Sequence, residues 1–97
     1  MSLLHIVAKS PFTHQALAAC LARLGQGDAL LLMEDAVAAA VAAAATPWPD
    51  RGPVFVLSPD LAARGLADRP LRSGVTLVDY GGFVDLAARH DGTLSWF

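Results

Sequence analysis

The sequence predicts an α/β fold: a three-layer α/β/α sandwich with a five-stranded parallel sheet, formed by one domain covering residues 1–97. Short apolar runs without polar alternation recur along the chain, which is typical of parallel strands covered on both faces. Residues that favour helix starts follow several of these runs, as at Ser10-Pro11, Ser58-Pro59 and Asp79. Because strand–helix–strand crossovers are right-handed, we expect helices on both faces of the sheet.

The first strand is expected at residues 3–8, where His5 is the single polar interruption. Ser10 suits an N-cap and Pro11 the first helical position, where its missing N–H is not needed. A helix is therefore predicted to about Leu24, ending at Gly25. Its apolar stripe recurs at the helical period and comprises Leu17, Cys20, Leu21 and Leu24.

A second buried strand is expected at residues 29–33, after Asp28. Glu34 and Asp35 place negative charge at the start of an alanine-rich helix predicted over Ala36–Ala45, which complements the helix dipole. Residues 46–53 are rich in proline and read as a loop.

The remaining elements follow the same pattern, in which an apolar run is followed by a residue that favours a helix start. A third strand is expected at residues 54–57, with a short helix capped by Ser58 and closed by Gly65. A fourth strand is expected at residues 75–78, and Asp79 should cap a helix from about Gly82 to His90. The β-prone residues 93–97 are expected to form a fifth strand.

Composition favours an oligomer. Hydrophobic residues make up 55% of the chain and the mean hydropathy is +0.46, which is high for a solitary domain of 97 residues. We therefore expect apolar surface to be covered by partners, in either a homo-oligomer or a hetero-oligomer.

Charge and cysteine content exclude several classes of protein. The net charge is −2 and the arginines are scattered, so direct binding of nucleic acid is not expected. The single cysteine, Cys20, fits a reducing compartment. No signal peptide is expected, and the longest apolar run is too short for a membrane span. These features predict a cytoplasmic protein that does not associate with membranes.

Several segments, in order along the chain, resemble the DsrH/TusB family of small subunits of the DsrEFH and TusBCD sulfur-relay complexes. The matching segments are His5, Ser10-Pro11-Phe12, residues 27–37, residues 60–66, residues 78–84 and Trp96. They cover nearly the whole chain. The resemblance implies a three-layer α/β/α fold and a heterohexamer of two copies each of three related subunits.

The resemblance also implies a function. The chain would serve a cytoplasmic persulfide sulfurtransferase complex acting in 2-thiolation of the tRNA wobble uridine or in dissimilatory sulfur oxidation. Its partners would be DsrE/TusD-like and DsrF/TusC-like subunits, with a small sulfur carrier of the TusA or TusE type acting indirectly. In the family the main sulfur-accepting cysteine lies on a sister subunit, so this chain is expected to be non-catalytic alone, a structural subunit with at most an accessory thiol.

Cys20 is the candidate catalytic residue, as a persulfide carrier. Sulfur transfer requires a thiolate, and Arg23, three residues further along a helix, would favour the anion. The other interpretation is that Cys20 packs against the apolar stripe of its helix, as free cysteines often do. The position of a cysteine in the first helix matches the DsrH branch of the family.

A second hypothesis is a standalone anion-binding domain or enzyme that uses the crevice at the carboxyl ends of the strands. Lys9 and Ser10 follow the first strand and could hold an anion. Asp35, Asp60 and Asp79 also fall at strand ends, where helix capping or acid–base chemistry would explain them.

No cofactor or metal ion is expected. Gly25-Gln26-Gly27 follows a helix, whereas phosphate-binding loops follow a strand. The three histidines, His5, His14 and His90, lack metal-ligand spacing, and His5 is expected to be a hydrogen-bonded core residue. The aromatic residues near the C-terminus could form either a partner-binding patch or ordinary core; they are Tyr80, Phe83, Trp96 and Phe97.

Overall fold

The computed structural model describes residues 1–50 and 52–97; Arg51, in the proline-rich loop, lies outside the described residues. Five parallel strands form one sheet in the order β4-β3-β2-β1-β5. In chain order the elements are β1 (Leu3–Val7), α1 (Ala16–Leu21), β2 (Ala29–Leu32), the 3₁₀ helix η1 (Glu34–Ala40), β3 (Val54–Leu57), α2 (Ser58–Ala63), β4 (Val75–Val78), α3 (Tyr80–Arg89) and β5 (Gly92–Trp96). The predicted α/β fold with a five-stranded parallel sheet is therefore confirmed.

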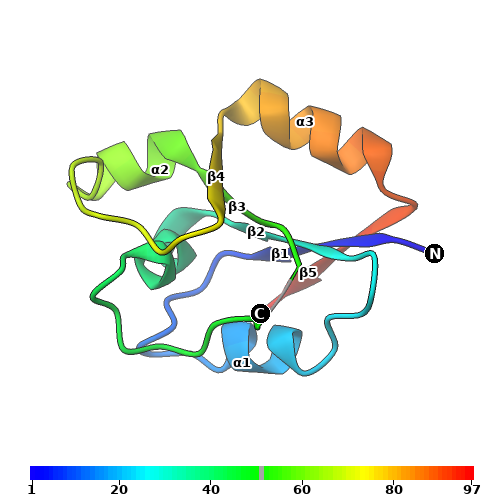
Figure 1. Cartoon of the computed structure of the whole chain (residues 1–97), viewed down its shortest axis with the longest axis horizontal. Coiled ribbons are helices and arrows are strands. Elements are labelled where there is room, and N and C mark those ends of the chain that lie inside the picture. The colour runs from blue at the N-terminus through cyan, green and yellow to red at the C-terminus, as the bar shows by residue number, and fades with distance from the viewer. Residues whose placement is uncertain (51) are drawn as a thin grey trace.

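The strand order explains an unequal distribution of helices over the two faces. From β1 to β4 each strand is added on the same side of the last, so right-handed crossovers place α1, η1 and α2 on one face. The connection from β4 to β5 runs in the opposite direction, so α3 covers the other face. Figure 1 shows α1 and α3 on opposite sides of the sheet.

Two hydrophobic clusters separate these faces. The larger contains the buried residues of α1 and η1 together with alternate residues of the central strands, such as Val7, Leu30 and Val56. The smaller lies under α3, where Leu86 packs with Leu4 and Leu31. Successive strand residues point to opposite faces, so every residue of β2 is buried.

The first helix is shorter than predicted. The hydroxyl of Ser10 accepts a hydrogen bond from the backbone N–H of Phe12 at 3.2 Å, which forms a local turn instead of a helix cap. Helix α1 begins only at Ala16, the first residue of this segment that reaches the core. Because short helices are stabilised mainly by packing, the polar residues before Ala16 do not extend it.

The alanine-rich helix predicted over Ala36–Ala45 is also shorter than predicted, and it is of a different type. The chain forms a 3₁₀ helix that ends at Ala40, and Val41 then pairs with Leu71 in an isolated antiparallel bridge. Arg72 explains the ending: its backbone N–H binds the Ala40 carbonyl at 2.9 Å, and its guanidinium binds the Ala39 and Ala44 carbonyls at 3.0 and 2.6 Å. The Ala39 and Ala40 carbonyls are acceptors that further helical turns would need.

The guanidinium of Arg72 also lies over the ring of Trp48, with its central carbon 4.7 Å from the ring centroid. We call this set of contacts the Arg72 clip. It holds the alanine segment 41–46 to the loop before β4, although neither segment has regular secondary structure.

The caps follow the prediction at one helix and depart from it at another. Asp79 caps α3, accepting a hydrogen bond from the Gly82 N–H at 2.8 Å, as predicted. Ser58 does not cap α2; it is the first helical residue and makes no side-chain cap bond. Gly82 leaves room beside Val78, because a Cβ at this position would approach the Val78 Cβ to 3.0 Å.

Candidate functional site

The buried polar centre of the molecule is formed by Asp28, His5 and Trp96, which we call the Asp28–His5–Trp96 network. His5 is 1% exposed and Asp28 is 7% exposed. The His5 Nε2 atom lies 2.8 Å from Asp28 Oδ2, and the Trp96 indole Nε1 lies 3.0 Å from His5 Nδ1. The prediction that His5 is a hydrogen-bonded core histidine is confirmed.

Asp28 accepts two further hydrogen bonds, from the backbone N–H groups of Leu3 at 2.9 Å and Gly25 at 3.0 Å. Burial alone would raise the pKa of this carboxyl group, but the hydrogen bonds from His5, Gly25 and Leu3 outweigh it and hold the pKa below its ordinary value. Asp28 is therefore ionised at neutral pH. Its position directly before β2 was visible in the sequence, whereas its pairing with His5 depends on the three-dimensional structure.

Cys20 lies on α1 and is 0% exposed. Burial, and secondarily the negative charge of Asp28, raises the pKa of its thiol to about 12. Arg23, which was expected to favour the thiolate anion of Cys20, is exposed to solvent. Cys20 packs in the larger hydrophobic cluster and is protonated at neutral pH. A persulfide on Cys20 stays a prediction, and it requires α1 to expose the thiol.

The crevice at the carboxyl ends of the strands has a volume of about 240 Å³. It lies where the sheet order changes direction at β1, which is where ligands bind in open α/β sheets. Its size is below the usual range of small-molecule sites, roughly 300–1,000 Å³. Its lining residues are Ile6, Ala8, Lys9, Met33, Glu34, Ser95, Trp96 and Phe97.

The residues proposed for an anion site do not converge on this crevice. Lys9 lines it, but the Ser10 hydroxyl is engaged in its local turn. Asp79 follows β4, three strands away from β1, a separation of roughly 14 Å.

The other strand-end carboxylates have structural partners. Asp60 accepts a hydrogen bond from the backbone N–H of Glu34, a residue with a positive φ of 49°, and Asp35 pairs with the Arg64 guanidinium at 3.0 Å. Asp60 therefore binds a backbone N–H at the start of η1 rather than of its own helix, and Asp35 pairs with Arg64, so both carboxylates connect α2 to η1.

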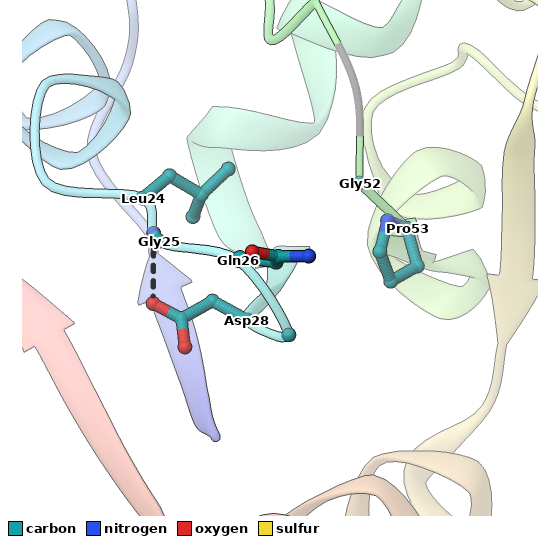
Figure 2. Close-up of a pocket in the computed structure, with 7 residues that line it drawn as sticks. Leu24, Gly25, Gln26, Asp28, Gly52 and Pro53 are labelled. Atoms are coloured by element: carbon teal, nitrogen blue, oxygen red, sulfur yellow. Dashed lines mark hydrogen bonds between the residues drawn. The ribbon is translucent and has the colours of Figure 1, made fainter. Parts of the chain in front are cut away.

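A larger hollow of about 410 Å³ lies at the opposite end of the sheet (Figure 2). It is lined by Leu24, Gly25, Gln26, Gly27, Asp28, Gly52 and Pro53. Figure 2 shows the Asp28 carboxylate turned toward the Gly25 N–H, as its hydrogen bond requires. The hollow therefore presents mainly backbone and apolar side chains.

A third hollow, of about 250 Å³, is shallow and almost wholly apolar. It is lined by Phe12, Ala38, Val41, Ala43, Ala44 and Leu66. Phe12 is 63% exposed beside it. This apolar hollow lies on the same side of the sheet as η1 and α2.

The remaining sequence candidates are distributed over the molecule. The four aromatic residues do not form one patch: Phe83 and Trp96 pack against the core, whereas Tyr80 and Phe97 are exposed beyond opposite edge strands. His14 is exposed, and His90 donates from Nδ1 to the Leu86 carbonyl at 2.7 Å.

Among the described residues, 1–50 and 52–97, no cluster of three or more His, Cys, Asp or Glu side chains could hold a metal ion. Within the same residues no helix is long and apolar enough to cross a membrane.

The strand order and the helix arrangement define a small three-layer α/β domain, and comparison with solved structures agrees. The crystal structure of the ychN protein from E. coli superposes with a TM-score of 0.76, covering 98% of this chain and 99% of that one at 22% sequence identity. This likeness establishes the fold.

The sequence comparisons establish the family. The family model described as "DsrH like protein" matches residues 9–93. Curated relatives named Protein TusB align over 97% of this chain and 100% of their own length: 34% identical in Pectobacterium parmentieri, 38% in Klebsiella pneumoniae (strain 342) and 36% in Escherichia coli (strain K12). The chain belongs to the DsrH/TusB family.

Proposed function

We propose that this chain is a subunit of a sulfur-relay complex of the TusBCD/DsrEFH type, acting in the cytoplasm in 2-thiolation of the tRNA wobble uridine. The observation that carries the proposal is the full-length similarity to proteins named TusB. The partners would be TusD/DsrE-like and TusC/DsrF-like subunits. The chain would bind no nucleic acid directly, consistent with its net charge of −2.

Within such a complex we assign this chain a structural and partner-binding role. Sulfur transfer proceeds by attack of a thiolate, and the rate depends on the thiolate fraction and on access to the sulfur. Cys20 is 0% exposed and the pKa of its thiol is about 12, so it meets neither condition in this conformation. The acceptor cysteine would belong to a sister subunit, and Cys20 would be at most an accessory thiol.

Exposed apolar side chains support the partner-binding role. Seven large hydrophobic side chains are exposed among the described residues: Met1, Phe12, Leu77, Tyr80, Val84, Leu94 and Phe97. Phe12 borders the apolar hollow and is the side chain we expect a sister subunit to cover.

Coexpression with the sister subunits tests the assembly. We expect the chain to elute in a defined complex that contains all three subunits, as judged by size exclusion and native mass spectrometry. Phe12→Glu should weaken assembly, whereas Gln15→Glu, an equal change of charge at a nearby exposed position, should not. A chain that stays monomeric and soluble and binds neither sister subunit would refute the proposal.

The pathway needs a separate test. Deleting the gene from its own host should remove most 2-thiouridine from the tRNAs that carry it, and restoring the gene should return it. If thiouridine stays at the wild-type level while oxidation of stored or supplied sulfur fails, the complex serves dissimilatory sulfur oxidation instead.

A further inference from the structure

The hydrogen-bond chemistry of the Asp28–His5–Trp96 network fixes the protonation state of His5. An indole N–H can only donate, so His5 Nδ1, which lies 3.0 Å from Trp96 Nε1, must be the unprotonated acceptor. The ring proton is therefore on Nε2, where it is donated to Asp28 at 2.8 Å. His5 is neutral and held in one tautomer in this arrangement.

A second proton on His5 is incompatible with this geometry. It would bind at Nδ1, and two N–H groups would then face each other across the 3.0 Å gap to Trp96 without an acceptor between them. The bond to Asp28 would survive, because both N–H groups of a charged imidazole donate and Asp28 is ionised. The contact that breaks is therefore the one to Trp96.

Trp96 lies at a position where the loss of its hydrogen bond to His5 can change its place in the structure. It ends β5, an edge strand whose single neighbour in the sheet is β1, and it is only partly buried. Trp96 and the following residue, Phe97, both line the crevice at the carboxyl ends of the strands. The buried network thus connects His5 to the shape of that crevice.

The charged and titratable groups around His5 are few. Asp28 faces it from the loop before β2, and Cys20 on α1 is close enough for the Asp28 charge to act on its thiol. The strands on either side of β1, which are β2 and β5, contribute no titratable side chain. His5 is the side chain of this cluster that gains a positive charge on protonation, at the Nδ1 atom that faces Trp96.

We propose that protonation of His5 releases the Trp96 indole, so that the network acts as a proton-operated latch on the C-terminal end of β5 and on the crevice that Trp96 and Phe97 border. The released state keeps the His5–Asp28 pair, and the sheet and α1 stay folded. The latch depends on this chain alone and is independent of its role in a sulfur relay.

Nuclear magnetic resonance on the full-length ¹⁵N-labelled chain tests the latch, with Trp48→Phe used to assign the Trp96 indole signal. The pH is lowered stepwise over the range in which the chain stays folded, and the His5 ring signals are followed as they change from a neutral to a charged imidazole. The Trp96 indole N–H signal should move with the same midpoint and exchange faster with water, while backbone signals of β2 and β3 stay in place.

Two variants separate the latch from general acid sensitivity. His5→Gln retains one donor and one acceptor but cannot take up a proton, so its Trp96 signal should not respond to pH in this range. Trp96→Phe removes the opposing N–H, so His5 should bind its proton about tenfold more tightly than in the wild type.

Three outcomes would overturn the proposal. The first is a Trp96 signal that stays unchanged while His5 becomes charged. The second is a wild-type proton on Nδ1 at neutral pH. The third is a His5 titration midpoint that is the same in Trp96→Phe as in the wild type. The last measurement keeps the proposal testable if His5→Gln does not fold.

Discussion

The Asp28–His5–Trp96 network and the Arg72 clip perform similar tasks in very different surroundings. Each joins segments far apart in the sequence through side-chain hydrogen bonds: the network links β1 to β5 and to the residue before β2, and the clip links η1 and the alanine segment to the loop before β4. His5 and Asp28 of the network are buried and Trp96 is partly buried, whereas the side chains of the Arg72 clip, Arg72 and Trp48, are half-buried. A polar group that loses its partner costs most free energy where water cannot replace that partner. We therefore expect substitutions in the network to lower the free energy of unfolding more than substitutions in the Arg72 clip.

The largest effect is expected at Asp28. Asp28→Ala would leave three donors without their acceptor, namely His5 Nε2 and the backbone N–H groups of Leu3 and Gly25. We expect it to lower the free energy of unfolding by about 3–4 kcal/mol, measured by urea denaturation. A loss similar to that at the exposed Asp68, as judged by Asp68→Ala, would contradict the weight given to the network.

The pH dependence sharpens the same comparison. The pKa of Asp28 is lower in the folded chain than in the unfolded one, so its contribution is present above the unfolded pKa of about 3.9 and is lost as the pH falls through the folded pKa. In the His5→Gln background, where no imidazole can change its charge, the stability difference made by Asp28→Ala should therefore be constant near neutral pH and shrink below about pH 4. A difference that grows in acid would contradict this sign.

A smaller effect is expected at the Arg72 clip. Arg72→Met keeps the aliphatic stem but removes the hydrogen bonds to the Ala39 and Ala44 carbonyls and the contact with Trp48. We expect a loss of about 1–2 kcal/mol, and faster amide hydrogen exchange confined to residues 41–46. Arg69→Met, in the same loop, is the matched control and should leave that exchange unchanged.

The cap of α3 should contribute about as much as one surface hydrogen bond. Asp79→Ala removes the bond to the Gly82 N–H and should cost about 1 kcal/mol by thermal or urea unfolding. Asp85→Ala, at an exposed position within the same helix, should be nearly neutral. Equal losses in the two variants would mean that the cap is not what stabilises the start of α3.

The smallest effect is expected at the Asp35–Arg64 pair. Both side chains are exposed, at 67% and 32%, and the pair is screened by water. Asp35→Ala should change the free energy of unfolding by less than about 0.5 kcal/mol. A loss as large as that of Arg72→Met would show that burial does not rank these polar contacts as argued above.

The same contrast explains how much could be predicted from the sequence. The five strands were predicted within a residue or two, because each is an apolar run bounded by turn residues. The alanine-rich helix was predicted to extend too far because carbonyls of that segment bind Arg72, about thirty residues away, and local propensity carries no information on such a contact.

The candidate site shows a similar division. The sequence predicted that His5 is a hydrogen-bonded core residue, because it lies inside an apolar strand. Its partners, Asp28 and Trp96, could not be predicted, because they come from separate parts of the chain. The sequence left Cys20 between packing and persulfide chemistry. Its burial depends on how α1 lies on the sheet and shows that the thiol packs in the core in this conformation, whereas the persulfide role stays a prediction.

The most direct test of the proposed role follows sulfur through the assembled complex. The chain would be copurified with its TusD/DsrE-like and TusC/DsrF-like subunits, supplied with a persulfide donor at neutral pH, and each subunit weighed intact by mass spectrometry. We predict that a sister subunit gains sulfur while the mass of this chain is unchanged. Sulfur that is found on this chain and on neither sister subunit, and that is absent from the Cys20→Ala variant, would contradict the account.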